Sequence, residues 1–174
     1  MSLLAVRNRA EALIDLLGIT KPPVDVVAIA NRVGLQVIFT DLGDDISGAL
    51  ITGPHGSCIA IRKSDPEPRK RFSIAHETAH HYLGHQFDAG EHVHVDRGHL
   101  ISLRNHRSSA GTDLKEIEAN QFAACLLMPS RILRESIKRL NGDQLYDSDI
   151  TALAKQYQVS EQAMTIRLSA LRLL

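Results

Sequence analysis

The feature that most constrains this chain is a helical segment that carries two histidines one turn apart. Residues 76–80 read His-Glu-Thr-Ala-His, inside a pattern that predicts a helix over residues 67–83. Gly84 suits the position just past the end of that helix, where a left-handed conformation is common. Because residues i and i+4 lie on one face of a helix, the imidazoles of His76 and His80 can bind a single ion.

The chemistry of this pair favours zinc and hydrolysis. Neutral imidazole nitrogens suit Zn²⁺, which takes nitrogen and oxygen ligands in a tetrahedral arrangement. Glu77 lies about 100° around the helix from His76, so it can reach a water molecule at the metal without being a ligand. We therefore predict that His76 and His80 are metal ligands and that Glu77 is the catalytic base.

The third ligand must come from farther along the chain, because a catalytic zinc takes three protein ligands and keeps one position open. The downstream candidates are Glu91, His92, His94, His99, His106, Glu116 and Glu118. Residues 113–128 are predicted to form a helix, and its helical wheel separates the two last glutamates. With Leu114 at the origin, Glu118 falls at about 40°, on the apolar face, and Glu116 at about 200°.

The two glutamates therefore receive different predicted roles. A carboxylate on an apolar face is costly unless it is paired or bound to a metal, so Glu118 is predicted to be the third ligand. The alternative for Glu118 is a salt bridge with a buried arginine. Glu116 lies three residues after Asp113, which is the spacing of a capping box, so it is predicted to cap the helix.

Other polar residues near the motif have less defined roles. His81 turns away from the metal-binding face, and His85 is expected either to support a ligand or to be exposed. The group that stabilises the transition state is left open among Tyr82, His106 and Arg107. His92 and His94 alternate like an exposed strand rather than like a ligand pair.

The elements expected along the chain are helical with a few short strands. Helices are expected over residues 3–17, 22–33, 67–83, 113–128 and 130–140, with two more between 148 and 174; strands are expected over 35–39, 49–52 and 57–62, with a possible edge strand over 99–104. This order predicts an α+β fold with a small antiparallel sheet. We expect a main domain over residues 1–145 and a C-terminal helical pair over 146–174 with helix-turn-helix proportions.

Composition narrows the class of protein. The chain has 20 lysines and arginines against 20 aspartates and glutamates, so its net charge gives no reason to expect nucleic acid as the main partner. Cys58 and Cys125 are the only cysteines, too few for a disulfide framework. Without a secretory signal or a long apolar run, we expect a cytoplasmic protein with no membrane partner.

Four stretches of the sequence together resemble the ImmA/IrrE family of zinc metallopeptidases. They are residues 23–30, the site segment 72–85, the segment 116–129 with its Glu-Ala-Asn-Gln-Phe-Ala run, and residues 159–168. The resemblance implies a gluzincin-like core in which two histidines and one glutamate hold Zn²⁺, here matched to His76, His80 and Glu118. It also implies intracellular action on helix-turn-helix repressors or on antitoxins.

We therefore expect a zinc metalloendopeptidase that cleaves a regulatory protein, a repressor or an antitoxin, in a stress-response or mobile-element circuit. The alternative is a DNA-binding regulator or toxin–antitoxin component that uses the C-terminal helices. The candidate recognition helix begins Glu161-Gln-Ala-Met and offers only Arg167 and Arg172, whereas a reading helix presents polar or basic residues near its N-terminus. Direct nucleic-acid binding is therefore the less favoured expectation.

Overall fold

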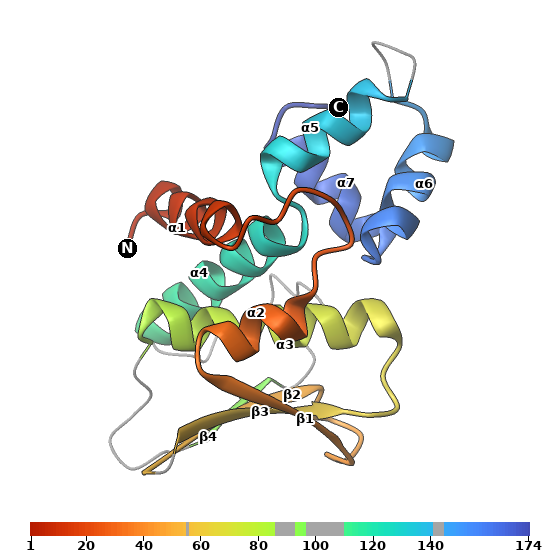
Figure 1. Ribbon diagram of the computed structural model, residues 1–174. Coiled ribbons are helices and arrows are strands. Elements are labelled where there is room, and N and C mark those ends of the chain that lie inside the picture. Colours follow the sequence, from red (N-terminus) through yellow and green to blue (C-terminus); the bar gives the residue numbers. More distant parts are fainter. Residues whose placement is uncertain (55, 86–92, 97–109, 141–144) are drawn as a thin grey trace.

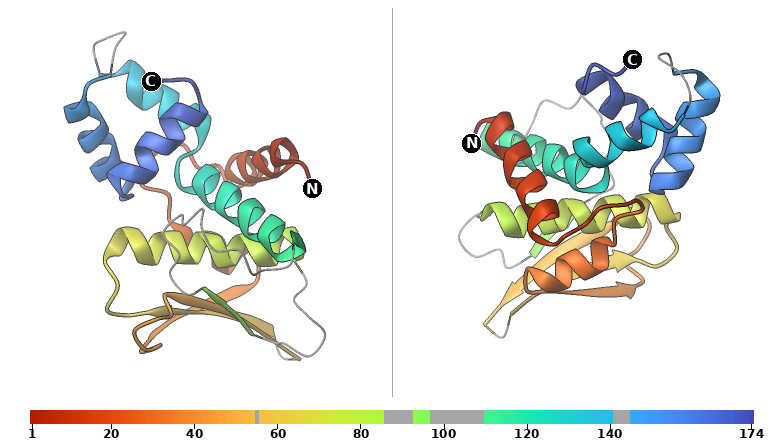
Figure 2. Two further views of the ribbon diagram at one scale, coloured as in Figure 1. Left: turned by 180° about the vertical axis from the view of Figure 1, so that it is seen from behind. Right: turned by 45° about the horizontal axis from the view of Figure 1, so that its top comes forward.

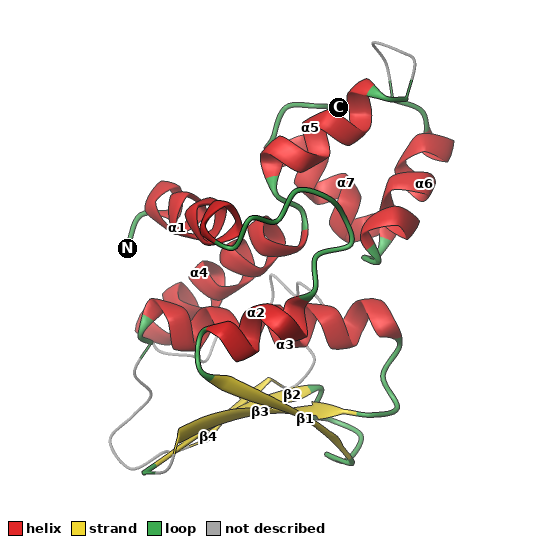
Figure 3. Cartoon of the chain, viewed as in Figure 1, coloured by secondary structure: helices red, strands yellow, loops and turns green. Residues whose placement is uncertain are grey.

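The computed structural model describes residues 1–54, 56–85, 93–96, 110–140 and 145–174. Within these ranges the chain forms seven helices and four strands (Figures 1 and 3). In order they are α1 (Leu3–Leu16), α2 (Val26–Arg32), β1 (Leu35–Thr40), β2 (Gly48–Gly53), β3 (Gly56–Arg62), α3 (Glu67–Leu83), β4 (Val93–Asp96), α4 (Ala110–Leu127), α5 (Ser130–Lys138), α6 (Asp147–Tyr157) and α7 (Glu161–Ala170). The α+β class predicted from the sequence is confirmed.

The sheet has the strand order β1-β3-β2-β4 and is mixed rather than antiparallel. Strands β2 and β3 form the expected hairpin, with Gly53 opposite Gly56, but β1 pairs with β3 in parallel, starting with Leu35 opposite Ser57. The prediction of an antiparallel sheet was therefore wrong for β1. The reason is the connection over residues 41–47, which passes the end of β3, where the Arg62 side chain donates to the carbonyl of Gly43 at 3.2 Å.

The fourth strand includes His94, one of the two histidines that alternate like a strand. Strand β4 covers Val93–Asp96 and pairs antiparallel with β2, with Gly48 opposite Asp96. The possible strand over residues 99–104 lies outside the described residues.

The site helix α3 lies between two layers. The sheet covers one side of it, α2 runs beside it, and α4 with α1 packs on the other side (Figures 1 and 2). Every residue from Ser73 to His80 is consequently buried. Because α3 is covered on two sides, its polar residues His76, Glu77 and His80 lie inside the molecule.

Strand β2 approaches α3 closely at Gly48. A Cβ atom added there would lie 3.2 Å from the Ser73 Cβ and 3.3 Å from the Ile61 Cδ1, closer than ordinary van der Waals contact. It would also lie 3.7 Å from the Cγ of Glu77. The sheet and the site helix therefore meet at this glycine, directly beside Glu77.

The C-terminal helices share their core with the rest of the chain. Tyr157, Met164 and Leu168 are fully buried in the same hydrophobic cluster as residues of α1 and α4. Arg167 is only 3% exposed, and its guanidinium donates to the Met128 carbonyl at 3.0 Å and to Glu11 at 3.2 Å. The boundary at residues 145 and 146 stays a prediction.

Among the described helices, none combines the length and the apolar composition needed to cross a membrane.

Candidate metal centre and active site

Three side chains from α3 and α4 converge on one point. The Nε2 atoms of His76 and His80 lie 2.9 Å apart, and the Glu116 carboxylate lies 3.2 Å from the first and 3.4 Å from the second. Ligand atoms around a tetrahedral zinc ion at 2.0–2.2 Å are roughly 3.3–3.6 Å apart. A small outward shift of the imidazoles would therefore give the spacing that zinc requires.

The hydrogen bond between His76 and Asn120 leaves the Nε2 of His76 able to bind a metal. Its Nδ1 lies 3.0 Å from the Oδ1 of Asn120, an acceptor, so Nδ1 carries the proton and donates it. Nε2 then presents a lone pair toward His80 and Glu116. Lone pairs and a carboxylate at such distances repel one another unless a cation or a proton lies among them. This donor set therefore fits a zinc ion.

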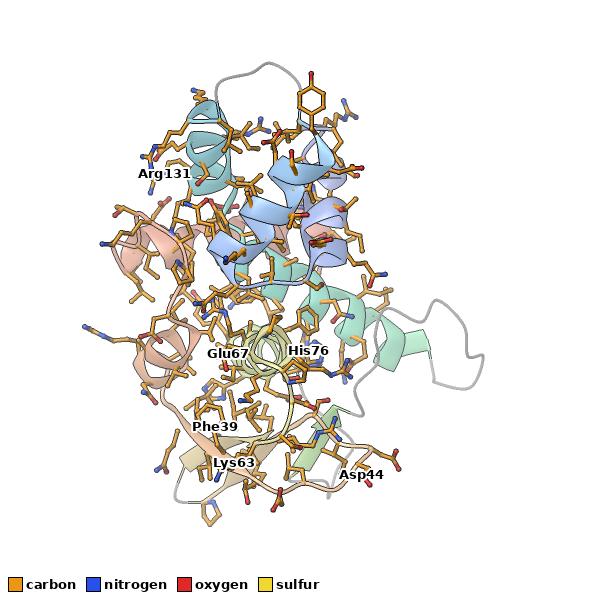
Figure 4. The ribbon with its side chains drawn as sticks, turned by 90° about the vertical axis from the view of Figure 1, so that its right-hand side faces the viewer. Phe39, Asp44, Lys63, Glu67, His76 and Arg131 are labelled. Atoms are coloured by element: carbon orange, nitrogen blue, oxygen red, sulfur yellow. The ribbon has the colours of Figure 1, made fainter. Side chains whose placement is uncertain are left out.

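The metal group has one side open to solvent. His76 is 4% exposed and His80 is fully buried, whereas the Glu116 side chain is 35% exposed. In the view along α3, His76 lies on the side of the helix opposite α2 (Figure 4).

Glu77, the predicted base, lies on α3 between the two histidines. It follows His76 directly on α3, is fully buried, and lies against β2 at Gly48. Its carboxylate is thus held between the sheet and the helix, away from bulk water.

The structure places Glu116, not Glu118, at the two imidazoles, so the geometry differs from the predicted ligand set of His76, His80 and Glu118. Glu118 is buried as predicted, but its carboxylate contacts the Met1 amine at 2.5 Å and His85 at 3.0 Å. Among the described residues, no arginine pairs with Glu118, which is the alternative that the sequence left open. The predicted capping box was wrong as well, because α4 begins at Ala110, and Glu116 therefore lies inside the helix.

The helical-wheel reasoning failed because its reference residue is not in the core. Leu114 is 60% exposed and Ile117 is 48% exposed, while the buried face is centred on Ala119 and its neighbours one turn on. On that corrected wheel, Glu116 and Glu118 are about 200° apart and lie on opposite flanks of the buried face. The flank of Glu116 faces the site on α3, together with Asn120 four residues later.

Asn120 is the functional residue that the sequence reasoning missed. The available signal was its spacing of four residues from Glu116, which puts both side chains on one stripe of α4.

The other candidate residues divide between described and undescribed parts of the chain. His81 contacts the Val33 carbonyl at 3.2 Å, away from the metal group, as predicted. The Tyr82 ring packs against Phe122 at 5.3 Å, with the Arg9 guanidinium 5.0 Å from its centre, so it lies toward α1. His106 and Arg107, the other two candidates for transition-state stabilisation, lie outside the described residues, as do Glu91, His92 and His99.

His85 and Glu118 form a buried pair next to the metal group. His85 Nε2 lies 3.0 Å from a Glu118 oxygen, and His85 Nδ1 lies 3.0 Å from His80 Nδ1. Burial lowers the pKa of His85, although the hydrogen bond to Glu118 opposes this shift. Burial alone would raise the pKa of Glu118, but the hydrogen bonds from the Met1 amine and from His85 bring it below its ordinary value.

Comparisons with known proteins agree with this geometry. No curated protein matches the chain significantly. A solved structure described as a Mycobacterium tuberculosis transcriptional regulator matches with a TM-score of 0.66 and 20% sequence identity, over 95% of this chain and 46% of that chain. At that identity the likeness shows a shared fold, and the present chain spans less than half of the matched protein. A family model, the IrrE N-terminal-like domain of the peptidase M78 family, matches residues 30–169. Because this match covers most of the sequence and confirms the resemblance to ImmA/IrrE proteins, the chain belongs to the peptidase M78 family.

Proposed function

We propose that this chain is a zinc-dependent endopeptidase in which His76, His80 and Glu116 hold the metal and Glu77 is the base. The observation that carries the proposal is the convergence of two imidazole nitrogens and a carboxylate beside a buried glutamate on the same helix. Two histidines from one helix and a glutamate from the next are also the ligand set of a gluzincin-like core. Membership of a peptidase family supports the same assignment.

The residues of the chain divide the hydrolysis between them. When bound, zinc supplies Lewis acidity, which lowers the pKa of water and polarises the carbonyl of the scissile peptide. Glu77 accepts the proton of the attacking water and passes it to the amine that leaves, so that a C–O bond forms as the C–N bond breaks. Asn120 holds the His76 ring in the orientation and tautomer that a metal requires.

The substrate class that we propose is a regulatory protein inside the cell, a helix-turn-helix repressor or an antitoxin. The matched solved structure is named a transcriptional regulator, which fits a place in a regulatory circuit. The buried site opens on the side of Glu116, which suits an exposed, flexible segment of a protein rather than a packed surface.

The alternative of DNA binding through the C-terminal helices is less well supported. Arg167, one of two arginines that the candidate recognition helix offers, is 3% exposed and bonded within the protein. It cannot reach a base edge without breaking these bonds. A gel-shift experiment with genomic fragments tests this alternative, and tight sequence-specific binding by the chain would support it.

The central experiment separates metal binding from catalysis. Glu77→Gln keeps the size of the side chain but cannot accept the proton, so we expect full zinc content and a loss of cleavage of at least about 10²-fold. The matched control is Glu67→Gln, on the first turn of the same helix, where the side chain is 63% exposed. It should cleave as the wild type does.

The substrate is found by using Glu77→Gln protein as a trap. Proteins captured on it are offered to wild-type protein with zinc, and the cut site is read by mass spectrometry. A captured DNA-binding regulator or antitoxin that is cut once or twice supports the proposal. If the Glu77→Gln protein cleaves at the wild-type rate, Glu77 is not the base. Rapid digestion of casein by wild-type protein, with no preferred partner, would contradict the substrate class.

A further inference from the structure

A chain of hydrogen bonds leads from the buried His80 to Glu118 through His85. His80 Nδ1 and His85 Nδ1 are 3.0 Å apart, and His85 Nε2 is 3.0 Å from Glu118 Oε2. The His85 and Glu118 side chains are only 7% and 10% exposed. These contacts lie outside the three-residue metal group, although the series of hydrogen bonds ends at His80, which belongs to that group.

The end of α3 is built to bring His85 back against His80. Gly84 adopts a left-handed conformation, with φ of 72°, which reverses the chain after the last helical turn. The backbone N–H of His85 then donates to the His80 carbonyl at 3.0 Å, in the manner of a Schellman cap. The two rings meet edge to face, with centroids 5.0 Å apart. A glycine at 84 is therefore what permits the histidine at 85 to reach the ligand.

One arrangement of protons in this pattern puts a lone pair on the His80 nitrogen that faces the metal group. The Glu118 carboxylate is an acceptor, so His85 Nε2 carries a proton and donates it. A neutral His85 then presents a lone pair at Nδ1, which accepts from His80 Nδ1–H. His80 is left with its lone pair on Nε2, the atom that faces His76 and Glu116. The same tautomer is imposed on His76 by Asn120.

We propose that His85 and Glu118 are positioning residues, which hold His80 in the tautomer and orientation that metal binding requires. This rests on the proposed function, since it assumes that His80 is a zinc ligand. His85 is not itself a ligand in this arrangement, because both of its ring nitrogens are bonded elsewhere. Outer partners of this kind raise metal affinity by roughly 10- to 100-fold.

The test measures zinc affinity by chelator competition, independently of activity. We expect His85→Ala to weaken zinc binding by roughly 10- to 100-fold. His85→Asn should restore part of the loss, because an amide oxygen can take the place of Nδ1 and accept from His80. The matched control is His81→Ala, the neighbouring histidine, whose ring contacts the Val33 carbonyl and not the metal group. It should bind zinc as the wild type does.

A second readout reports the tautomer directly. Long-range ¹H–¹⁵N NMR of zinc-free wild-type protein should show His80 protonated at Nδ1, and the His85→Ala protein should show a mixture or the other tautomer. An open pocket of about 450 Å³ borders His85 and Glu118, so water can fill the space left by the truncated side chain. If His85→Ala still proves unfolded, His85→Asn and Glu118→Gln decide the question in the same two assays.

The outcomes separate this inference from the proposed function. Wild-type zinc affinity in His85→Ala, with His80 still protonated at Nδ1, would overturn the positioning role alone. Failure of wild-type protein to bind zinc at all would overturn the proposed function together with it.

Discussion

The most discriminating prediction sets Glu116→Ala against Glu118→Ala. The two residues are two positions apart on α4, yet the structure puts one carboxylate within 3.2 Å and 3.4 Å of the imidazole nitrogens and the other against His85 and the Met1 amine. The two truncations should therefore rank in opposite order on two separate quantities, the affinity for zinc and the stability of the zinc-free protein.

The expected magnitudes follow from the contacts. Structural zinc binds with about 10–16 kcal/mol through four ligands, so one ligand contributes about 2.5–4 kcal/mol, which predicts a loss of roughly 10²- to 10³-fold in affinity for Glu116→Ala. Glu118→Ala removes a support of a ligand and should weaken zinc by roughly 10- to 100-fold. For stability the order reverses. Glu116 is 35% exposed and its loss costs little, whereas losing Glu118 leaves the buried His85 N–H without its acceptor, which costs about 1–3 kcal/mol.

The assay measures both quantities on the same preparations. Chelator competition gives the zinc dissociation constant, and urea unfolding of zinc-free protein gives the free energy of unfolding. If Glu118→Ala empties the site while Glu116→Ala binds zinc normally, Glu118 and not Glu116 is the third ligand. Equal effects of both changes on both quantities would mean that the two carboxylates act as one unit.

Three further predictions concern residues around the site. Asn120→Ala removes the acceptor for His76 Nδ1–H, and chelator competition should show zinc affinity lowered roughly 10-fold. Gly48→Val forces a side chain against Ser73, and urea unfolding should show a loss of about 1–3 kcal/mol. Arg167→Ala breaks buried hydrogen bonds; we expect a loss of stability of about 1–3 kcal/mol and no change in zinc affinity.

Each of these has a result that would count against it. Unchanged zinc affinity in Asn120→Ala would show that the His76 tautomer is set by another group. A Gly48→Val protein as stable as wild type would mean that β2 can move away from α3 at no cost. Lost zinc binding in Arg167→Ala would show that the C-terminal helices support the site as well as the core.

Much of the local structure was predictable because it depends on neighbours in sequence. Helix α3 has the bounds that were predicted, since its capping glycine and its apolar periodicity are encoded within the segment. The convergence of His76 and His80 was predictable for the same reason, because a regular helix places residues i and i+4 on one face. The burial of Glu118 also agrees with its predicted place on the apolar face of its helix.

What only the tertiary structure decided depends on which faces of distant elements meet. The pairing of β1 with β3 depends on how residues 41–47 cross the sheet, and the sequence of β1 is compatible with either neighbour. The third member of the metal group depends on which flank of α4 lies against α3. The sequence pattern selected Glu118, which lies on the other flank, in place of Glu116. The contacts of His85 with His80 and Glu118 likewise depend on tertiary structure, because the turn at Gly84 and the packing of α4 against α3 bring the three residues together. Helical periodicity specifies directions within one element, whereas the rotation of one helix against another is determined by packing over the whole core.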